Sequence, residues 1–527
     1  MDPVPAQIAP DDGLVLPANH EGTLLDRAFT RAGGAPLVRG NGARLLKDGA
    51  ENYPAWLNAI RNAEQKIYFE NYFICEDEVG AEFADALAAR ARAGVRVRLI
   101  YDWVGAFRRT SRHFWRTLSA AGVEVRCFNP PRLLSPIEVL HRDHRKMLAV
   151  DGRVGFITGL CVGRMWLGDP ARGREPWRDT GLEVCGPALH DIERAFAQVW
   201  AAIGSPLPEG EIRERDAIAE AGNVTLRIVA NMPGTSGVFR LDQLIAAAAR
   251  RTLWLTDAYF AGIPPYVQAL RAAALDGVDV RLLVPGASDI PTLRPLSQAG
   301  YRPLLEAGVR VFEWNGSMLH AKTAVADCRW ARVGSSNLNI ASWVNNYELD
   351  AVVEDEGFAT AMEHMYLADL DSATEIVLHP RRRAKDRSAR RASRAAGSHT
   401  AREILGMSGP GGSASRAAAG ALRVGRTVGA ALSRERVLEL TEARLVAAVG
   451  AVLLSIAVVG TLWPLVLAVP LVVLFLWAGG ALLARAYAMH RERRSLGLPT
   501  SRIAPVNSRH PAEQPGRDER ARHTTMK

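Results

Sequence analysis

One short sequence pattern occurs twice in the chain, and it restricts the possible folds more than any other feature. The pattern His-x-Lys-x-x-x-x-Asp spans His144–Asp151 and returns at His320–Asp327. Each copy runs into a turn of small residues, Thr158-Gly159 in the first and Gly334-Ser335-Ser336 in the second. One copy would be a weak signal, but two copies in matching surroundings indicate a long internal duplication.

The surroundings of the two motifs repeat in the same order at a nearly constant offset. Each half is predicted to contain a strand, a helix closed by a glycine, a second strand and, after a small turn, a third strand. These segments are 66–74, 81–93, 95–101 and 123–128 in the first half, and 253–260, 266–275, 278–284 and 309–314 in the second. Alternating strands and helices predict a duplicated α/β fold with mixed sheets flanked by helices.

Length and composition are those of a globular protein of several units. The chain has 527 residues, of which 48% are hydrophobic and 23% charged, whereas an ordinary domain has ~100–200 residues. The net charge of +9 favours an anionic partner, either nucleic acid or an anionic membrane. The five scattered cysteines form no C-x-x-C pair, which argues against a zinc ribbon or a thioredoxin-like site and predicts reduced thiols.

The composition changes along the chain in a way that predicts six segments. They are a flexible N-terminal arm (1–40), the first repeat (41–205), the second repeat (222–376), a basic linker (377–444), an apolar segment (445–484) and a polar C-terminal tail (485–527). A polar connection around 204–222 separates the repeats. The N-terminus has no basic stretch followed by an apolar one, so no secretory signal is expected.

The apolar segment predicts membrane attachment. Residues 445–484 are forty positions without a charged side chain, and one bilayer crossing needs ~20 apolar residues. Trp463-Pro464 supplies a turn in the middle, so the segment is predicted to be a two-helix transmembrane hairpin. Arginines flank both of its ends, which places both ends in the cytoplasm. Nine Lys/Arg against one Asp between 381 and 402 would attract anionic headgroups.

The motif residues suit the transfer of a phosphoryl group. His and Lys at positions i and i+2 of an extended segment point to the same face. Each half therefore offers one imidazole and one ammonium, His144 with Lys146 and His320 with Lys322. The lysines can neutralise phosphate oxygens, one histidine can attack phosphorus, and the other can move a proton. This chemistry requires no metal or cofactor, and the sequence contains no dense Asp/Glu/His cluster.

Four acidic residues complete the candidate site. Asp151 and Asp327, which close the two motifs, are counted with the catalytic set. A reactive histidine needs an acceptor on its second ring nitrogen. Asp179 and Glu348 stand at comparable places after the two motifs and are predicted to orient the histidines.

Some of these residues also have simpler explanations. A histidine on an apolar strand is usually a core residue, but two His-x-Lys pairs in duplicated surroundings argue against that interpretation. The basic run Arg108–Arg116 is typical of a solvated face and equally suits the entrance for an anionic headgroup. The sequence leaves both explanations of this run open.

The motifs make the chain similar to the phospholipase D superfamily, whose hallmark is this pattern in two copies. Within it the chain resembles the bacterial cardiolipin synthases, particularly those of type B. The resembling stretches are Gly42–Tyr53, Arg142–Lys146, Asp257–Phe260 and Leu319–Asn339, and the likeness extends from about Ala43 to Asp371.

The resemblance implies a bilobal fold with the active site between the halves. It implies transfer of a phosphatidyl group between two phosphatidylglycerol molecules, with release of glycerol, at the bacterial inner membrane. It implies a phosphohistidine on His144, an acid/base role for His320, and phosphate contacts from Ser335 and Asn337. The expected partners are an anionic phospholipid and the membrane, and not nucleic acid.

The first half departs from the family pattern at one place. Relatives tend to have Gly-Gly-x-Asn where this chain has Thr158-Gly159-Leu160-Cys161. A thiol is a much weaker hydrogen-bond donor than an amide. The phosphate contact of the first half is therefore in question, whereas the His/Lys pair is not.

Three kinds of function remain open from the sequence. The first is cardiolipin formation. The second is another phospholipase D-type reaction, namely phosphatidylserine or phosphatidylglycerol synthesis, lipid hydrolysis or nuclease action. The third is a catalytically inactive membrane scaffold. The predicted hairpin argues against a nuclease and the two intact motifs argue against a scaffold, but the acceptor alcohol and the oligomeric state do not follow from the sequence.

Overall fold

The computed structural model describes residues 24–131, 141–289 and 293–378, with scattered residues between 451 and 483. The described residues up to 378 lie in one compact unit, Met1–Pro464, and Leu465–Lys527 is grouped as a second. Among the described residues no helix is long and apolar enough to cross a bilayer. The predicted basic linker, the polar tail and most of the predicted hairpin fall outside the described residues.

Fifteen strands form one continuous sheet, in the order β15-β11-β10-β9-β12-β13-β14-β8-β1-β7-β6-β5-β2-β3-β4. In the first repeat the strands are β1 (Val38–Lys47), β2 (Lys66–Asn71), β3 (Arg96–Asp102), β4 (Glu124–Phe128), β5 (Met147–Val150), β6 (Val154–Thr158) and β7 (Thr180–Cys185). In the second they are β8 (Val224–Asn231), β9 (Thr252–Thr256), β10 (Asp279–Pro285), β11 (Arg310–Trp314), β12 (Thr323–Ala326), β13 (Trp330–Gly334), β14 (Glu348–Val353) and β15 (Ala373–Ile376).

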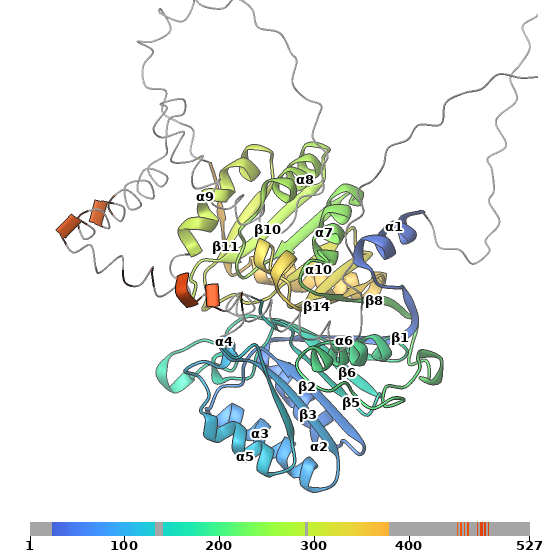
Figure 1. Ribbon diagram of the computed structural model, residues 1–527. Coiled ribbons are helices and arrows are strands. Elements are labelled where there is room, and N and C mark those ends of the chain that lie inside the picture. The colour runs from blue at the N-terminus through green and yellow to red at the C-terminus, as the bar shows by residue number, and fades with distance from the viewer. Residues whose placement is uncertain are drawn as a thin grey trace, which may run out of the picture. The chain divides into compact units, whose positions relative to one another are not determined.

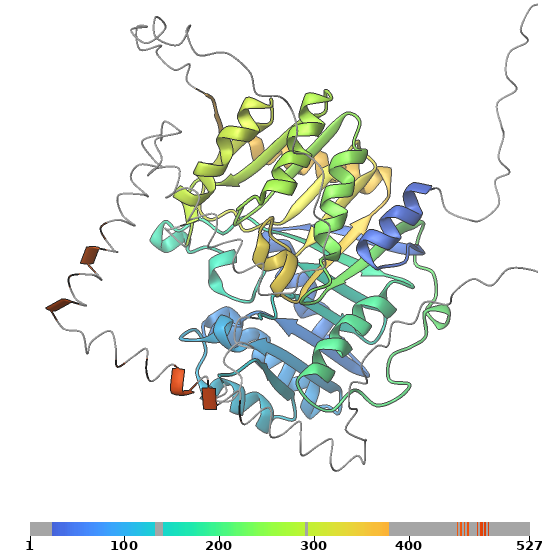
Figure 2. The same ribbon diagram turned by 45° about the horizontal axis from the view of Figure 1, so that its top comes forward.

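The two halves of the sheet mirror each other, which confirms the predicted duplication. Reading outward from the centre, β1-β7-β6-β5-β2-β3-β4 corresponds to β8-β14-β13-β12-β9-β10-β11. In each half three strands are parallel, and the strand that follows the motif histidine runs antiparallel beside them. The halves share one sheet because β1 pairs antiparallel with both β7 and β8. Figures 1 and 2 show the strands continuing from the first repeat (blue to teal) into the second (green to yellow).

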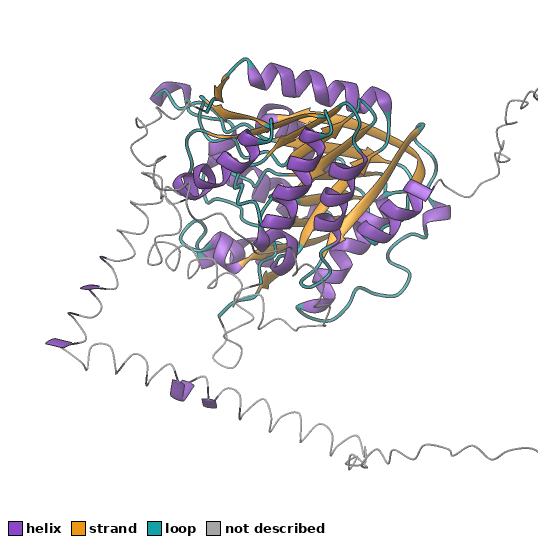
Figure 3. Cartoon of the chain, turned by 90° about the horizontal axis from the view of Figure 1, so that it is seen from above, coloured by secondary structure: helices purple, strands orange, loops and turns teal. Residues whose placement is uncertain are grey.

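Helices cover both faces of the sheet, as the view from above shows (Figure 3). They are α1 (Leu24–Gly33), α2 (Asp48–Arg61), α3 (Glu78–Arg92), α4 (Trp103–Ala106), α5 (Arg112–Ala120), α6 (Leu189–Ala202), α7 (Gly237–Ala248), α8 (Pro264–Leu275), α9 (Leu293–Glu306) and α10 (Glu356–Leu370). One core joins both repeats under α6 and α10, while a separate core lies under α2, α3 and α5, and another under α1, α7 and α8. The predicted α/β class is therefore confirmed.

Corresponding helices in the two repeats each end at a glycine. Gly94 follows α3 with φ of 90°, and Gly277 follows α8 with φ of 93°. Gly122 and Gly308 follow α5 and α9 with φ of 98° and 93°. Only glycine adopts this left-handed conformation without strain, so it closes each helix and directs the chain into the next strand.

Two predicted strands are shorter than the sequence indicates. β2 ends at Asn71 and β9 at Thr256, although the aromatic runs continue for several residues. After β9 the Asp257 carboxylate accepts hydrogen bonds from the backbone N–H of Tyr259 (3.1 Å) and Leu338 (2.8 Å), which turns the chain out of the sheet. As a result the residues directly after both strands are free to line the site.

The expected flexible arm 1–40 is wrong for its last part. Residues 24–33 form α1 and strand β1 begins at Val38. Phe29 of α1 stacks near Trp330 (6.5 Å between ring centroids), and Arg240 donates to the carbonyl oxygen of Ala32 (2.9 Å). An amphipathic helix with a buried phenylalanine gains from packing on the second repeat, and Figure 2 shows α1 (dark blue) there.

Candidate active site

The two motif histidines stand in extended segments directly before β5 and β12. Each segment is bound to the other half of the protein: the backbone N–H of His144 donates to Tyr347 O (2.9 Å), and that of His320 to Arg178 O (2.7 Å). The side chain of His144 is 12% exposed and that of His320 is 7% exposed. The two histidines therefore lie at the junction of the repeats, almost enclosed by protein.

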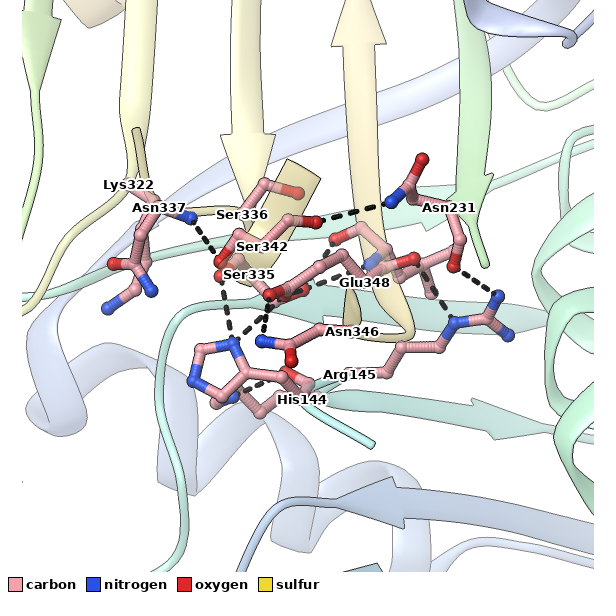
Figure 4. A network of polar contacts seen from close by, with 12 residues as sticks. His144, Arg145, Asn231, Lys322, Ser335, Ser336, Asn337, Ser342, Asn346 and Glu348 are labelled. Carbon is pink, nitrogen blue, oxygen red and sulfur yellow. Dashed lines mark hydrogen bonds and ion pairs between the residues drawn. The ribbon is translucent and has the colours of Figure 1, made fainter. Parts of the chain in front are cut away.

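Each histidine is hydrogen-bonded to a carboxylate from the opposite repeat. Nδ1 of His144 lies 2.9 Å from Oε2 of Glu348, at the start of β14 (Figure 4). Nδ1 of His320 lies 2.7 Å from Oδ2 of Asp179, which directly precedes β7. The structure thus brings both predicted orienting residues to the histidines, and the pairs cross between the halves.

Glu348 is fixed by three further polar contacts. The hydroxyl of Ser335 donates to Oε2, and the side-chain amide of Asn346 donates to Oε1 (3.1 Å). Burial alone would raise the pKa of Glu348, but His144, the charge of Lys146 and the hydrogen bond from Ser335 hold the pKa below its ordinary value. Arg145 donates to the main-chain oxygen of Glu348 (3.1 Å), so the same residue is held from both repeats.

Asp179 is held in an equivalent way. It accepts hydrogen bonds from Trp166 Nε1 (3.0 Å) and from the backbone N–H of Thr180 (2.8 Å). Gly159 leaves room for the carboxylate, because a Cβ there would lie 2.2 Å from Oδ1 of Asp179. Burial raises the pKa of Asp179, but His320 outweighs that effect and the net pKa is lowered. Both carboxylates are therefore ionised acceptors for the histidine N–H groups.

Burial keeps both imidazoles neutral near pH 7. It lowers the pKa of His144 against the opposing pull of Glu348. Burial, reinforced by Lys322, lowers the pKa of His320 to about 4. With the Nδ1 proton directed at a carboxylate, each neutral ring keeps the lone pair on Nε2. The site thus presents two potential nucleophiles or bases.

The two motif lysines reach a common centre. Lys146 and Lys322 are buried, and each ammonium donates to the carbonyl oxygen of its own motif histidine. The charge of each lysine acts on the histidine of the other repeat. Burial, together with the nearby charge of Lys146, lowers the pKa of Lys322 to about 8. The site therefore concentrates positive charge around two uncharged imidazoles.

Aromatic side chains form the walls of this centre, and sequence reasoning missed them. The Tyr72 ring lies 5.1 Å from the His144 ring, and Lys146 stands 5.2 Å from its centroid. Tyr259 lies 5.8 Å from His320, with Lys322 at 5.6 Å. The matching positions of the two tyrosines after corresponding strands could have identified them.

Asp151 and Asp327 lie in hairpin turns and not in the catalytic centre, where the motif pattern predicts them. Both adopt φ above 50° in the hairpin turns that follow β5 and β12. Each carboxylate accepts three backbone N–H groups, from residues 64–66 for Asp151 and from residues 250–252 for Asp327. Four strand residues, about 13 Å of chain, separate each aspartate from its motif lysine. These residues fix the turn and do not contact the histidines.

Replacing Asp151 with asparagine should destabilise the protein more than it slows the reaction. The variant keeps a residue that tolerates positive φ but loses the charge that three N–H groups bind, so we expect a loss of about 1–3 kcal/mol in unfolding free energy. Chemical denaturation measures this loss, and active-site titration normalises kcat to the folded fraction. A kcat per folded molecule reduced a hundredfold would return Asp151 to the catalytic set.

Ser335 and Asn337 are both buried after β13, but they are used differently. The Ser335 hydroxyl is taken up by Glu348 and by the backbone N–H of Leu349 (2.9 Å). In Asn337 the side-chain oxygen has no hydrogen-bond partner within the described residues. Cys161, at the matching place in the first repeat, is buried, and the charges of Lys146 and Lys322 act on its thiol. The two matching positions thus face the site with unequal groups.

A duplicated α/β body with two His-Lys pairs, each histidine oriented by the opposite repeat, defines the phospholipase D-like class. The profile described as "Cardiolipin synthase, PLD-like domain" matches residues 56–163 and 241–369. The chain belongs to the bacterial cardiolipin synthase family.

The family assignment rests on similarity along most of the chain. A cardiolipin synthase of Alkalihalophilus pseudofirmus is 32% identical over 357 residues, which cover 67% of this chain and 71% of the relative. Cardiolipin synthase A of Pseudomonas fluorescens is 34% identical over 355 residues, 66% of this chain and 73% of the relative. The expected likeness to type B in particular stays a prediction.

A solved structure supports the fold independently. The phosphatidylserine synthase of Haemophilus influenzae superposes with a TM-score of 0.51 at 16% identity, covering 67% of this chain and 92% of that one. At this identity the similarity concerns the fold alone.

Proposed function

We propose that the protein transfers a phosphatidyl group from one phosphatidylglycerol to a second, forming cardiolipin and releasing glycerol. The observation that carries the proposal is the pair of neutral, carboxylate-oriented histidines beside two lysines, His144 with Lys146 and His320 with Lys322. Membership of the cardiolipin synthase family supports the choice of substrate.

In the first step, Nε2 of His144 attacks phosphorus and the bond from phosphorus to the glycerol oxygen breaks. His320 gives its proton to that oxygen, and glycerol leaves. In the second step, neutral His320 takes the proton of the headgroup hydroxyl of a second phosphatidylglycerol. That oxygen attacks phosphorus, the N–P bond breaks, and His144 returns to its neutral form. The lysines stabilise the charge of both transition states.

His320 has to be protonated before it can act as the acid. Burial, reinforced by the charges of Lys322 and Lys146, lowers its pKa to about 4. A bound phosphodiester brings a negative charge within a few ångströms, and an opposite charge raises the pKa of an imidazole. The negative charge of the bound substrate therefore raises the pKa of His320, so that His320 carries a proton when it acts as the acid.

We further propose that the C-terminal segment 445–484 anchors the chain in the bacterial inner membrane as a hairpin, with the catalytic body on the cytoplasmic side. What supports this proposal is the absence of charged side chains along the segment and the arginines at both ends.

The test of the function uses membranes that contain the full chain. Incubation with phosphatidylglycerol labelled in its headgroup should release labelled glycerol and form cardiolipin in equal amounts. Phosphatidic acid as the product would indicate hydrolysis, and a serine-dependent product would indicate phosphatidylserine synthesis. Unchanged lipids would leave the inactive scaffold as the better explanation.

Asn337 and Cys161 occupy matching positions but differ in hydrogen-bonding strength. Replacing them with alanine should therefore lower kcat/KM by different amounts. Asn337→Ala should lower kcat/KM about 10- to 100-fold, because a hydrogen bond to a charged group contributes about 1.5–3 kcal/mol. Cys161→Ala should lower it less than about threefold, because a thiol is a weak donor. Steady-state kinetics of the two variants, which match by pseudo-symmetry, decides the point. Equal losses would mean that the thiol contacts phosphate as strongly as the amide does.

The pH dependence of kcat at saturating phosphatidylglycerol should be bell-shaped, because bound substrate has already raised the pKa of His320. On the acid side activity falls once His144 is protonated, and because its pKa is lowered that fall begins below about 6.5. On the basic side Lys322, whose pKa burial lowers to about 8, loses its charge, so kcat should fall about tenfold per pH unit once this lysine is deprotonated. Lys322→Arg, although slower, should lack the basic limb. A basic limb unchanged in that variant would assign it to another group.

A further inference from the structure

A short loop after β3 exposes apolar and basic side chains together. It runs from Trp103 to Arg109, and we call it the docking loop. Its first turn is α4, which the Asp102 carboxylate caps by accepting from the backbone N–H of Val104 (2.8 Å) and Gly105 (3.1 Å). Val104 is 41% exposed and Phe107 is 57% exposed. A firmly capped turn that leaves two large apolar side chains in water is a candidate for an interaction surface.

The docking loop packs directly on the wall of the active site. Gly105 lies so close to Tyr72 that a Cβ would come 2.2 Å from the Tyr72 carbonyl oxygen. The Tyr72 ring in turn contacts the His144 ring. Asp102, the cap of the loop, also accepts from the backbone N–H of Asp143 (3.0 Å), the residue before His144. The docking loop therefore contacts Tyr72, and only the Tyr72 side chain separates it from His144. Figure 1 labels α4 at the side of the junction between the repeats.

Positive charge accompanies the exposed apolar groups. Arg108 and Arg109 are exposed, as is Arg112 at the start of α5. Within the described part of the chain none of the three forms an ion pair with a carboxylate. The guanidinium of Arg109 stands 4.1 Å from the centroid of Phe73, and its charge also acts on Tyr72, Cys161 and Tyr259. Uncompensated arginines beside the site are complementary to an anionic surface.

The described residues at the corresponding place in the second repeat, Gly286–Asp289, carry an acidic group and no arginine. After β10 the chain continues with Gly286 and reaches Asp289, whose carboxylate accepts from the Tyr259 hydroxyl (2.8 Å). Among the described residues, those directly after β3 are apolar and basic, whereas those directly after β10 are not.

We propose that the docking loop seats the first repeat on the surface of an anionic lipid bilayer. Val104 and Phe107 enter the boundary between headgroups and acyl chains, and Arg108 and Arg109 bind lipid phosphates. This combination of apolar and cationic groups is the one that interfacial proteins use. The proposal deepens the proposed function and rests on it for the identity of the lipid. It also selects between the two explanations of the basic run Arg108–Arg116.

The experiment compares the full chain with two variants. Val104→Ser/Phe107→Ser removes the apolar groups of the docking loop. Leu275→Ser is the matched control, because Leu275 is 70% exposed at the end of α8 in the other repeat. Hydrogen exchange of peptide 103–109 is followed on phosphatidylglycerol vesicles and on phosphatidylcholine vesicles. Activity is measured on vesicular phosphatidylglycerol and on monomeric dihexanoyl-phosphatidylglycerol.

In the wild type and in Leu275→Ser, exchange in 103–109 should slow about tenfold on phosphatidylglycerol and much less on phosphatidylcholine. The double variant should lose this protection and about tenfold of its activity on vesicles, with activity on the monomeric substrate retained. The phosphatidylcholine arm controls for attachment through the C-terminal apolar segment. Equal exchange on both vesicles, or equal vesicle activity in all three proteins, would overturn the proposal.

Failure of the proposed function gives a different result. In that case no protein forms cardiolipin from the monomeric substrate, whereas protection of 103–109 on phosphatidylglycerol vesicles still reports docking. A loop that recognises a protein instead of lipid would show no vesicle-dependent protection at all, which counts against the proposal.

Discussion

Replacing His144 or His320 with alanine should lower kcat for cardiolipin formation by at least about 10³-fold, because each removes a group that makes or breaks a bond in both steps. The losses should not add in the double variant, since the two histidines act as one unit. His113→Ala is the control, because His113 is an exposed histidine on α5.

A covalent intermediate separates the two roles. Phosphatidylglycerol labelled in its phosphate should transfer label to the wild type during the first turnover, and acid-labile, base-stable label identifies phosphohistidine. His144→Ala should carry no label. A labelled His144→Ala protein would assign the attack to His320 and reverse the mechanism, while leaving the lipid products as proposed.

Changing Asp179 to asparagine should lower kcat by about 10³- to 10⁴-fold, although Asp179 belongs to the first repeat and acts on His320 of the second. The amide offers a donor as well as an acceptor, so it no longer holds the Nδ1 proton in place, and the imidazolium loses its counter-charge. Glu348→Gln should have a similar cost through His144. Glu183→Gln is the control, because Glu183 lies in β7 close to Asp179 along the chain but pairs with Arg44 and is 22% exposed.

The leaving group distinguishes the two crossed pairs. A phosphatidyl ester of p-nitrophenol departs without a proton, so it should restore most of the first-turnover rate of Asp179→Asn, as measured by the burst of p-nitrophenol. The same ester should not rescue Glu348→Gln, whose defect lies in the attacking histidine. Equal rescue of both variants would show that Asp179 and Glu348 position the site as a whole, without separate partners.

Much of the fold follows from local sequence patterns. Residues close together in the sequence determine the glycine helix ends at 94 and 277, the buried strands and their duplicated order. The α/β class and the mirrored halves could therefore be predicted. Strand ends could not. β9 stops at Thr256 because Asp257 binds the backbone of Leu338 (2.8 Å), a contact between residues 81 positions apart.

In the candidate site, too, local sequence predicts some features, whereas long-range contacts determine others. The histidines, the lysines and the two orienting carboxylates could be selected by type and spacing. Their pairing could not, because Glu348 and Asp179 each follow a motif at similar distance and neither spacing reveals the crossing. The motif pattern predicts a catalytic Asp151, but in the structure its carboxylate accepts hydrogen bonds from three backbone N–H groups. Ser335, expected at phosphate, is likewise taken up by Glu348.

The crossed pairs also determine when the chain becomes competent during folding. The partners of His144 and His320 are 204 and 141 positions away along the sequence. Contacts of such separation form only after the loops between them have closed. A first repeat that leaves the ribosome complete and folded still has an unoriented His144, because Glu348 has not yet been synthesised. Catalytic competence therefore requires both repeats to be folded and docked on each other.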